Sequence, residues 1–190
     1  MWTAISNLGD AAVTLPLAIV CTLWIALSDL RLARYWLLLL AGGMAVVGST
    51  KVLYAGCGIE FPAIGFRVIS GHTMMSSAVW PVLIVLLCRA AQMRHTSLGM
   101  TAGLLAAAVI GIARIFDEAH TVSEIVAGWI LGAIVASLFV RAFLSAHIKL
   151  RRPVIAAVSL LLVSTVSYGH HAPFQTIIER YSPWLCNHEW

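Results

Sequence analysis

The sequence predicts an all-α membrane protein, a polytopic bundle of about six transmembrane helices that forms one domain over residues 1–190. The chain is 61% hydrophobic and only 11% charged, and its mean hydropathy is +0.92. Its apolar residues are gathered in runs that approach the roughly 20 residues a helix needs to cross a bilayer. This composition lies outside the range of soluble domains, and we expect no nucleic-acid partner.

Each of the first three apolar runs has a recognisable feature. The first lacks a basic leader, so we do not expect it to be a cleaved signal peptide, and it ends at the polar Ser28-Asp29 pair. The second contains three glycines that permit close approach of another helix, and the third contains Pro81, which favours a kink. The six runs are residues 11–27, 35–54, 72–87, 98–112, 125–144 and 154–168.

The fourth, fifth and sixth apolar runs also have distinguishing features. The fourth stops just before a polar turn that begins with Arg114. The fifth carries Gly128 and Gly132, four positions apart, which indicate a face for helix packing. The sixth follows a basic turn and Pro153. Residues 169–190 are polar with scattered aromatic side chains, and we expect this tail to lie on the membrane surface.

Basic residues predict the orientation in the membrane. Six spans assign every loop to one of two sides, and eight of the twelve basic residues fall on one of them. The positive-inside rule places that side in the cytoplasm. We therefore expect a multi-pass protein of a bacterial-type cytoplasmic membrane, with the tail and both termini on the periplasmic or extracellular side. The basic residues on that second side are Lys51, Arg67, Arg114 and Arg180.

The four cysteines show no spacing that is typical of a metal site. We therefore expect neither a metal nor another cofactor. Cys57 and Cys186 both fall on the non-cytoplasmic side, where a disulfide can persist, although two free thiols are an equal alternative. Whether the protein forms a homo-oligomer is left open.

Three polar interruptions of the apolar pattern fall at the same membrane level. The largest spans residues 113–124, in which His120 and Glu124 are four positions apart and would share one face of a helix. A second is Ser70-Gly71-His72, and the third is the isolated Lys51. Ionisable side chains at the edge of a bilayer are costly, so such residues are candidates for function.

The residue types at these places indicate chemistry on an anion, for which phosphate is the commonest choice in membranes. Lys51 and Arg114 would neutralise its charge without a metal. One imidazole can attack phosphorus while the other protonates the departing oxygen. Glu124 would fix the tautomer of His120, and Ser70-Gly71 would offer backbone N–H groups at a helix start.

These motifs resemble those of the type 2 phosphatidic acid phosphatase superfamily of membrane lipid phosphatases. Ser70-Gly71-His72 is similar to its second motif, with Ile69 at the usual proline. Arg114, His120 and Glu124 match the spacing of its third motif, with Glu124 in place of aspartate and Ala113 in place of serine. Of the first motif only Lys51 is present, since Gly58 stands where an arginine is usual.

The resemblance implies a role for each matching residue. His120 would be the nucleophile that forms a phosphohistidine, Glu124 would orient it, and His72 would be the general acid. Phosphate would be bound by a set of cationic and backbone groups. Arg67 matches no motif of the family, and we add it to this set because it lies near the histidine motif and could supply the charge that the first motif lacks. The set is Lys51, Arg67, Ser70, Gly71 and Arg114.

We therefore predict a membrane enzyme that hydrolyses a phosphate monoester or pyrophosphate of a lipid at the outer face of the cytoplasmic membrane. Isoprenyl (undecaprenyl) pyrophosphate, phosphatidate, phosphatidylglycerophosphate and a lipid A phosphate all fit the sequence. One alternative is a phosphotransferase that uses the same histidine. Another is a catalytically degenerate lipid-binding or transport protein, which the incomplete first motif and Glu124 suggest.

Overall fold

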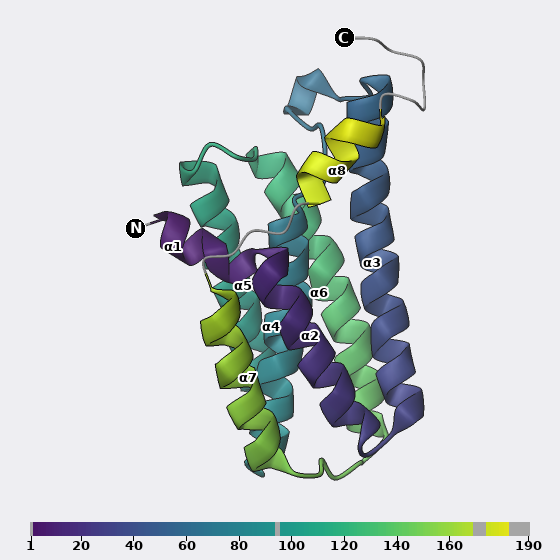
Figure 1. Ribbon diagram of the computed structural model, residues 1–190, viewed down its shortest axis with the longest axis vertical. Coiled ribbons are helices and arrows are strands. Elements are labelled where there is room, and N and C mark those ends of the chain that lie inside the picture. The colour runs from purple at the N-terminus through teal and green to yellow at the C-terminus, as the bar shows by residue number, and fades with distance from the viewer. Residues whose placement is uncertain (1, 94–95, 169–173, 183–190) are drawn as a thin grey trace.

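The computed structural model describes residues 2–93, 96–168 and 174–182, and most of them are helical (Figure 1). Long helices run side by side along one axis and form a bundle, as predicted. The elements in chain order are α1 (Trp2–Ser6), η1 (Asn7–Gly9), α2 (Ala11–Ala26), α3 (Leu30–Cys57), η2 (Pro62–Ile64), α4 (Gly71–Ala90), α5 (Thr96–Phe116), α6 (Val122–Ser145), α7 (Pro153–Ser167) and α8 (Phe174–Tyr181).

Four helices within the described residues, α3 to α6, are long and apolar enough to cross a membrane. The segment α1–η1 and helix α2 meet at a bend of 40° and together would make a fifth span. The sixth predicted run forms α7, an apolar helix of 15 residues. The prediction of a polytopic helical bundle is therefore confirmed, with four or five full-length spans and one shorter helix.

Helix α4 lies at the centre of the bundle. In its spanning window 72% of the residues are buried, against 22% to 39% for α3, α5 and α6. Glycines allow its neighbours to come close. A Cβ atom placed on Gly128 of α6 would lie 2.6 Å from the carbonyl oxygen of Ser70, and one on Gly103 of α5 would collide with the backbone of Pro81. The predicted packing face at Gly128 and Gly132 is thus the contact of α6 with α4.

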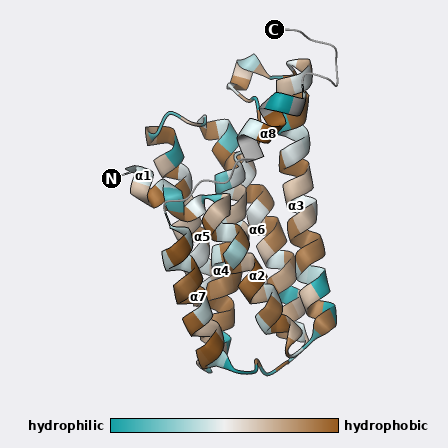
Figure 2. Ribbon diagram, viewed as in Figure 1, coloured by the Kyte–Doolittle hydropathy of each residue, from teal (hydrophilic) through white to brown (hydrophobic). Residues whose placement is uncertain are grey.

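The loops alternate between the two ends of the bundle (Figure 1). The α2–α3 and α6–α7 connections lie at one end, whereas the α3–α4 loop, the α5–α6 turn and α8 lie at the other. Figure 2 shows hydrophobic residues along the bundle and hydrophilic ones gathered toward the ends. Of the predicted surface tail, α8 is described and packs beside α3. Cys186 lies outside the described residues, so its pairing with Cys57 stays a prediction.

Candidate active site

The end of the bundle that holds the α5–α6 turn contains a cavity of about 330 Å³, here called the polar cavity. Four different helices, the loop before α4 and the α5–α6 turn contribute to it, so the three polar interruptions seen in the sequence do meet. Ser70 and Gly71 are the predicted residues that do not line it. The lining residues are Lys51, Tyr54, Arg67, Val68, His72, Arg114, Ala119, His120 and Glu124.

The start of α6 sets the geometry of His120. Thr121 is the N-cap residue, and Glu124 completes a capping box by accepting the backbone N–H of Thr121 at 3.2 Å. The same carboxylate oxygen of Glu124, Oε2, lies 2.8 Å from Nδ1 of His120. With Nδ1 donating to the carboxylate, the neutral ring keeps its lone pair on Nε2. The glutamate thus reaches His120 despite its extra methylene relative to aspartate.

Glu124 is fully buried, and both of its carboxylate oxygens are used. Its Oε1 accepts the backbone N–H groups of Arg67 at 3.0 Å and Val68 at 3.2 Å, from the loop that precedes α4. The guanidinium Nε of Arg67 lies 3.7 Å from the same oxygen. These contacts compensate the burial of a charge and hold the loop against the start of α6.

His120 lies in the turn between two spans, and its surroundings favour the neutral ring. Burial lowers the pKa of His120 below its ordinary value, while the hydrogen bond to Glu124 opposes that shift. The nearby cations Arg114 and Lys51 lower the pKa of His120 further. A neutral imidazole is the form that can act as a nucleophile near pH 7.

The cationic side chains of the polar cavity differ in their partners. Nη1 of Arg114 donates to the Ser6 hydroxyl at 3.1 Å, and its buried Nε has no partner among the described residues. A buried N–H without an acceptor is costly, and the oxygen of a bound anion would satisfy it. The Arg67 side chain is 47% exposed and lies over the Tyr54 ring at 5.9 Å.

The hydrogen bonds of Ser70 differ from the phosphate contact that the sequence predicts for it. Its backbone N–H donates to the carbonyl oxygen of Glu124 at 3.2 Å, and its buried hydroxyl accepts from Thr73 at the start of α4. These bonds tie α4 to α6, so neither group is directed to a ligand in the polar cavity. The geometry does not support the predicted phosphate contact of Ser70, because its backbone N–H already donates to the carbonyl oxygen of Glu124.

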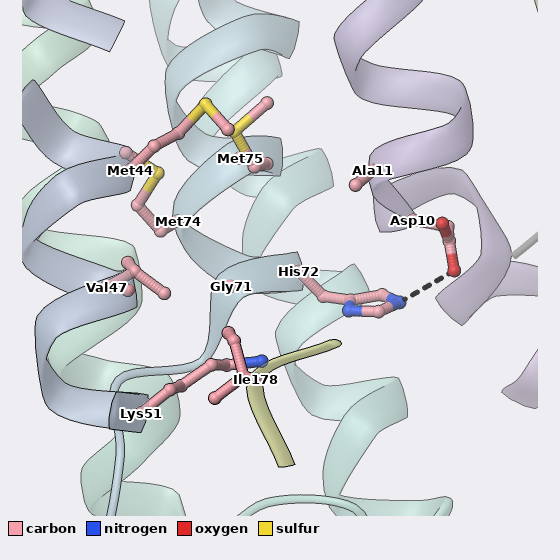
Figure 3. Close-up of a pocket in the computed structure, with 11 residues that line it drawn as sticks. Asp10, Ala11, Met44, Val47, Lys51, Gly71, His72, Met74, Met75 and Ile178 are labelled. Atoms are coloured by element: carbon pink, nitrogen blue, oxygen red, sulfur yellow. Dashed lines mark ion pairs between the residues drawn. The ribbon is translucent and has the colours of Figure 1, made fainter. Parts of the chain in front are cut away.

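Asp10 is a site residue that belongs to none of the three polar interruptions of the sequence. Its carboxylate oxygen Oδ2 lies 3.4 Å from Nε2 of His72, and the His72 ring is directed toward it (Figure 3). Asp10 also caps α2, since Oδ1 accepts the backbone N–H of Ala12 at 2.8 Å. One signal was present in the sequence: Asp10 is the single acidic residue in the first 28 positions, directly before an apolar run.

A second cavity, drawn in Figure 3, adjoins the first, and Lys51 and His72 are among the lining residues of both. It has a volume of about 200 Å³ and lies among α2, α3 and α4 with one residue from α8, and we call it the apolar cavity. Most of its lining is hydrophobic. The residues are Asp10, Ala11, Met44, Val47, Gly48, Lys51, Gly71, His72, Met74, Met75 and Ile178.

A helical membrane fold and a cavity that sets a carboxylate-bound histidine among cations define a membrane protein built to act on an anion. Comparison with known proteins gives the family: residues 58–148 match the PAP2 superfamily, and the chain belongs to that superfamily. The chain is also similar to an uncharacterized 22.5 kDa protein in the cps region of Klebsiella pneumoniae, with 33% identity over 140 residues. That alignment covers 73% of this chain and 67% of the relative. No solved structure gives a significant match.

Membership of the PAP2 superfamily makes the protein a phosphatase-type membrane enzyme whose substrate is a phosphate ester. The matched segment holds Arg67, His72, Arg114, His120 and Glu124. Lys51 precedes it. Gly58, at the position of the usual arginine, ends α3 in the left-handed region with φ of 64°. A glycine is favoured there, which gives a local reason for the missing arginine.

Proposed function

We propose that the protein is a lipid phosphatase that hydrolyses a phosphate monoester or pyrophosphate through a phosphohistidine on His120. The observation that carries the proposal is the contact of 2.8 Å between Nδ1 of His120 and Glu124 at a cavity lined by three cationic side chains. It directs the lone pair of Nε2 away from the carboxylate, while the orphan Nε–H of Arg114 supports an anion as the ligand. The other two cationic side chains of the cavity are Lys51 and Arg67.

The proposed reaction has two steps. Nε2 of His120 attacks phosphorus, the bond from phosphorus to the leaving oxygen breaks, and that oxygen takes a proton from His72. Water then attacks the phosphohistidine and gives a proton to His72, while the P–N bond breaks and its electron pair returns to His120. Glu124 stabilises the positive charge that His120 acquires during attack. Charge on the phosphoryl oxygens is neutralised by Lys51 and Arg114.

The apolar cavity supports a lipid as the substrate. It shares Lys51 and His72 with the polar cavity, so a phosphate held there has a hydrophobic space beside it. Methionine side chains line much of this space, and their flexibility suits an alkyl chain of variable shape. A lipid that enters from the bilayer would place its chain in the apolar cavity and its phosphate next to His120.

The experiment is phosphate release by the purified, detergent-solubilised protein from a panel of lipid phosphates. The panel holds undecaprenyl pyrophosphate, phosphatidate, phosphatidylglycerophosphate and a lipid A phosphate. Acid quenching of the reaction with a ³²P-labelled substrate would destroy a phosphohistidine, and alkaline quenching would preserve it. Label retained only after alkaline quenching supports the mechanism. Turnover without such a label, or a lipid that is bound and never cleaved, would contradict it.

We also propose that the active site faces the periplasmic or extracellular side of a bacterial cytoplasmic membrane. The basic residues at the start of α3 and in the α6–α7 connection lie at the end of the bundle opposite to the polar cavity, which supports this orientation. Reporter fusions after Arg94 and after Trp190 test it. We expect a cytoplasmic signal from the first and a periplasmic signal from the second, and the reverse result would overturn the orientation.

A further inference from the structure

The N-terminal segment, residues 2–10, contacts two functional groups of the polar cavity. It bends away from α2 and lies beside the ends of α4 and α5 (Figure 1). Its Ser6 hydroxyl accepts from Nη1 of Arg114, and its Asp10 carboxylate lies 3.4 Å from Nε2 of His72. The segment precedes the residues that match the PAP2 superfamily, so these contacts come from outside the matched region.

Tight packing fixes the position of this segment. A Cβ atom placed on Gly9 would lie 2.6 Å from Cγ2 of Ile110 on α5 and 2.7 Å from Oγ of Ser76 on α4. At the other end, the Trp2 ring stacks on Phe116 with centroids 4.4 Å apart. The residue that follows Gly9 is therefore held at a defined place between two helices, which is what a partner for a catalytic side chain requires.

The two carboxylate oxygens of Asp10 have different partners. Oδ1 caps α2 through the N–H of Ala12, whereas Oδ2 is the oxygen nearest to His72. Asp10 is only 5% exposed, so its charge acts in a medium of low dielectric constant. Asp29 offers a comparison, because it caps α3 by accepting the N–H of Arg31 at 2.8 Å and lies at the opposite end of the bundle.

We infer that Asp10 is a positioning residue for His72, an inference that rests on the proposed function. Lys51 and Arg114 line the same cavity as His72 and oppose a positive charge on its ring. The Asp10 carboxylate offsets the repulsion from these two cations and stabilises the imidazolium form of His72. It also engages Nε2 of the ring, so that this nitrogen does not act on the substrate. Nδ1 is then the nitrogen that gives its proton to the leaving oxygen as the P–O bond breaks. Asp10 itself does not exchange a proton.

The test compares two leaving groups in the full-length, detergent-solubilised protein. Dodecyl phosphate releases an alkoxide, which needs a proton, whereas 4-nitrophenyl phosphate releases a stable phenolate. The value of kcat/KM reports on the step that breaks the P–O bond. For Asp10→Asn, which keeps a good N-cap, we expect a loss of about 10²-fold on dodecyl phosphate and less than about threefold on 4-nitrophenyl phosphate. His72→Ala should show the same pattern, and Asp29→Asn should change neither value.

The outcomes separate this inference from the proposed function. Hydrolysis by the wild type combined with an equal loss on both substrates, or with no loss, would overturn the role of Asp10 alone. No hydrolysis of either substrate or of any lipid in the panel by the wild type would overturn the proposed function and this inference with it. If Asp10→Asn does not yield folded protein, Asp10→Ser keeps the cap without the charge and takes the same test.

Discussion

His120 and His72 both line the polar cavity, but they obtain their carboxylate partners in different ways. Glu124 is four residues from His120, and the same capping box that starts α6 brings them together. Asp10 is 62 positions before His72 and reaches it only because the chain bends between η1 and α2. One pair is thus a local consequence of sequence and the other a consequence of tertiary packing. The two histidines should therefore respond differently to substitution.

The largest difference is expected from the two alanine variants. His120→Ala removes the proposed nucleophile, so we expect kcat to fall by at least about 10⁴-fold and the alkali-stable ³²P label to disappear. His72→Ala should still form the label from 4-nitrophenyl phosphate, whose leaving group needs no acid. His147→Ala is the matched control, because His147 is at the other end of the bundle, beside the Ser145 carbonyl. Full activity in His120→Ala would end the proposed mechanism.

The pH dependence of Glu124→Gln tests the role of the carboxylate beside His120. The glutamate opposes the effect of burial on His120, so its neutralisation should lower the pKa of His120 further below its ordinary value. The neutral ring then persists to more acidic pH, and the acidic limb of the kcat/KM profile moves to lower pH. We expect kcat to fall by about 10²- to 10⁴-fold, because the tautomer is no longer fixed. An acidic limb that moves to higher pH would contradict the assignment.

The sequence allows prediction of contacts that depend on local spacing or on helix ends. The spacing of His120 and Glu124 predicts their contact. The predicted bounds of the second apolar run, which forms α3, were too short. Asp29 caps this helix earlier and Gly58 ends it later than apolar character alone indicates. The phosphate contact predicted for Ser70 is not supported, because its backbone N–H donates to a carbonyl oxygen on another helix, and no local sequence pattern reveals that bond. Asp10 was missed because its contact with His72 depends on the bend between η1 and α2, although its isolated charge before an apolar run was a signal in the sequence.

The contact of Ser70 with α6 also predicts a stability difference between two glycines. A Cβ atom on Gly128 would lie 2.6 Å from the Ser70 carbonyl oxygen and 3.3 Å from the backbone N of Met74, and neither backbone can rotate away. We expect Gly128→Ala to cost about 1–3 kcal/mol in unfolding free energy and to lower activity, since α4 and α6 carry His72 and Glu124. Gly42→Ala meets no atom within 4 Å and should be neutral or slightly stabilising. Thermal unfolding in detergent measures both, and equal melting temperatures would contradict this packing argument.

Arg67 should give the smallest effect, because it is a half-exposed cation. Its side chain is 47% exposed, so solvent and salt screen its attraction for a phosphate, unlike that of the half-buried Arg114. If Arg67 replaces the charge absent at Gly58, Arg67→Ala should raise KM by about three- to tenfold with little change in kcat, and the difference from wild type should shrink as ionic strength rises. Arg67→Lys keeps the charge and should retain most of the affinity. A fall in kcat with unchanged KM would instead indicate that Arg67 acts through its backbone and side-chain contacts with Glu124, and so through the orientation of His120.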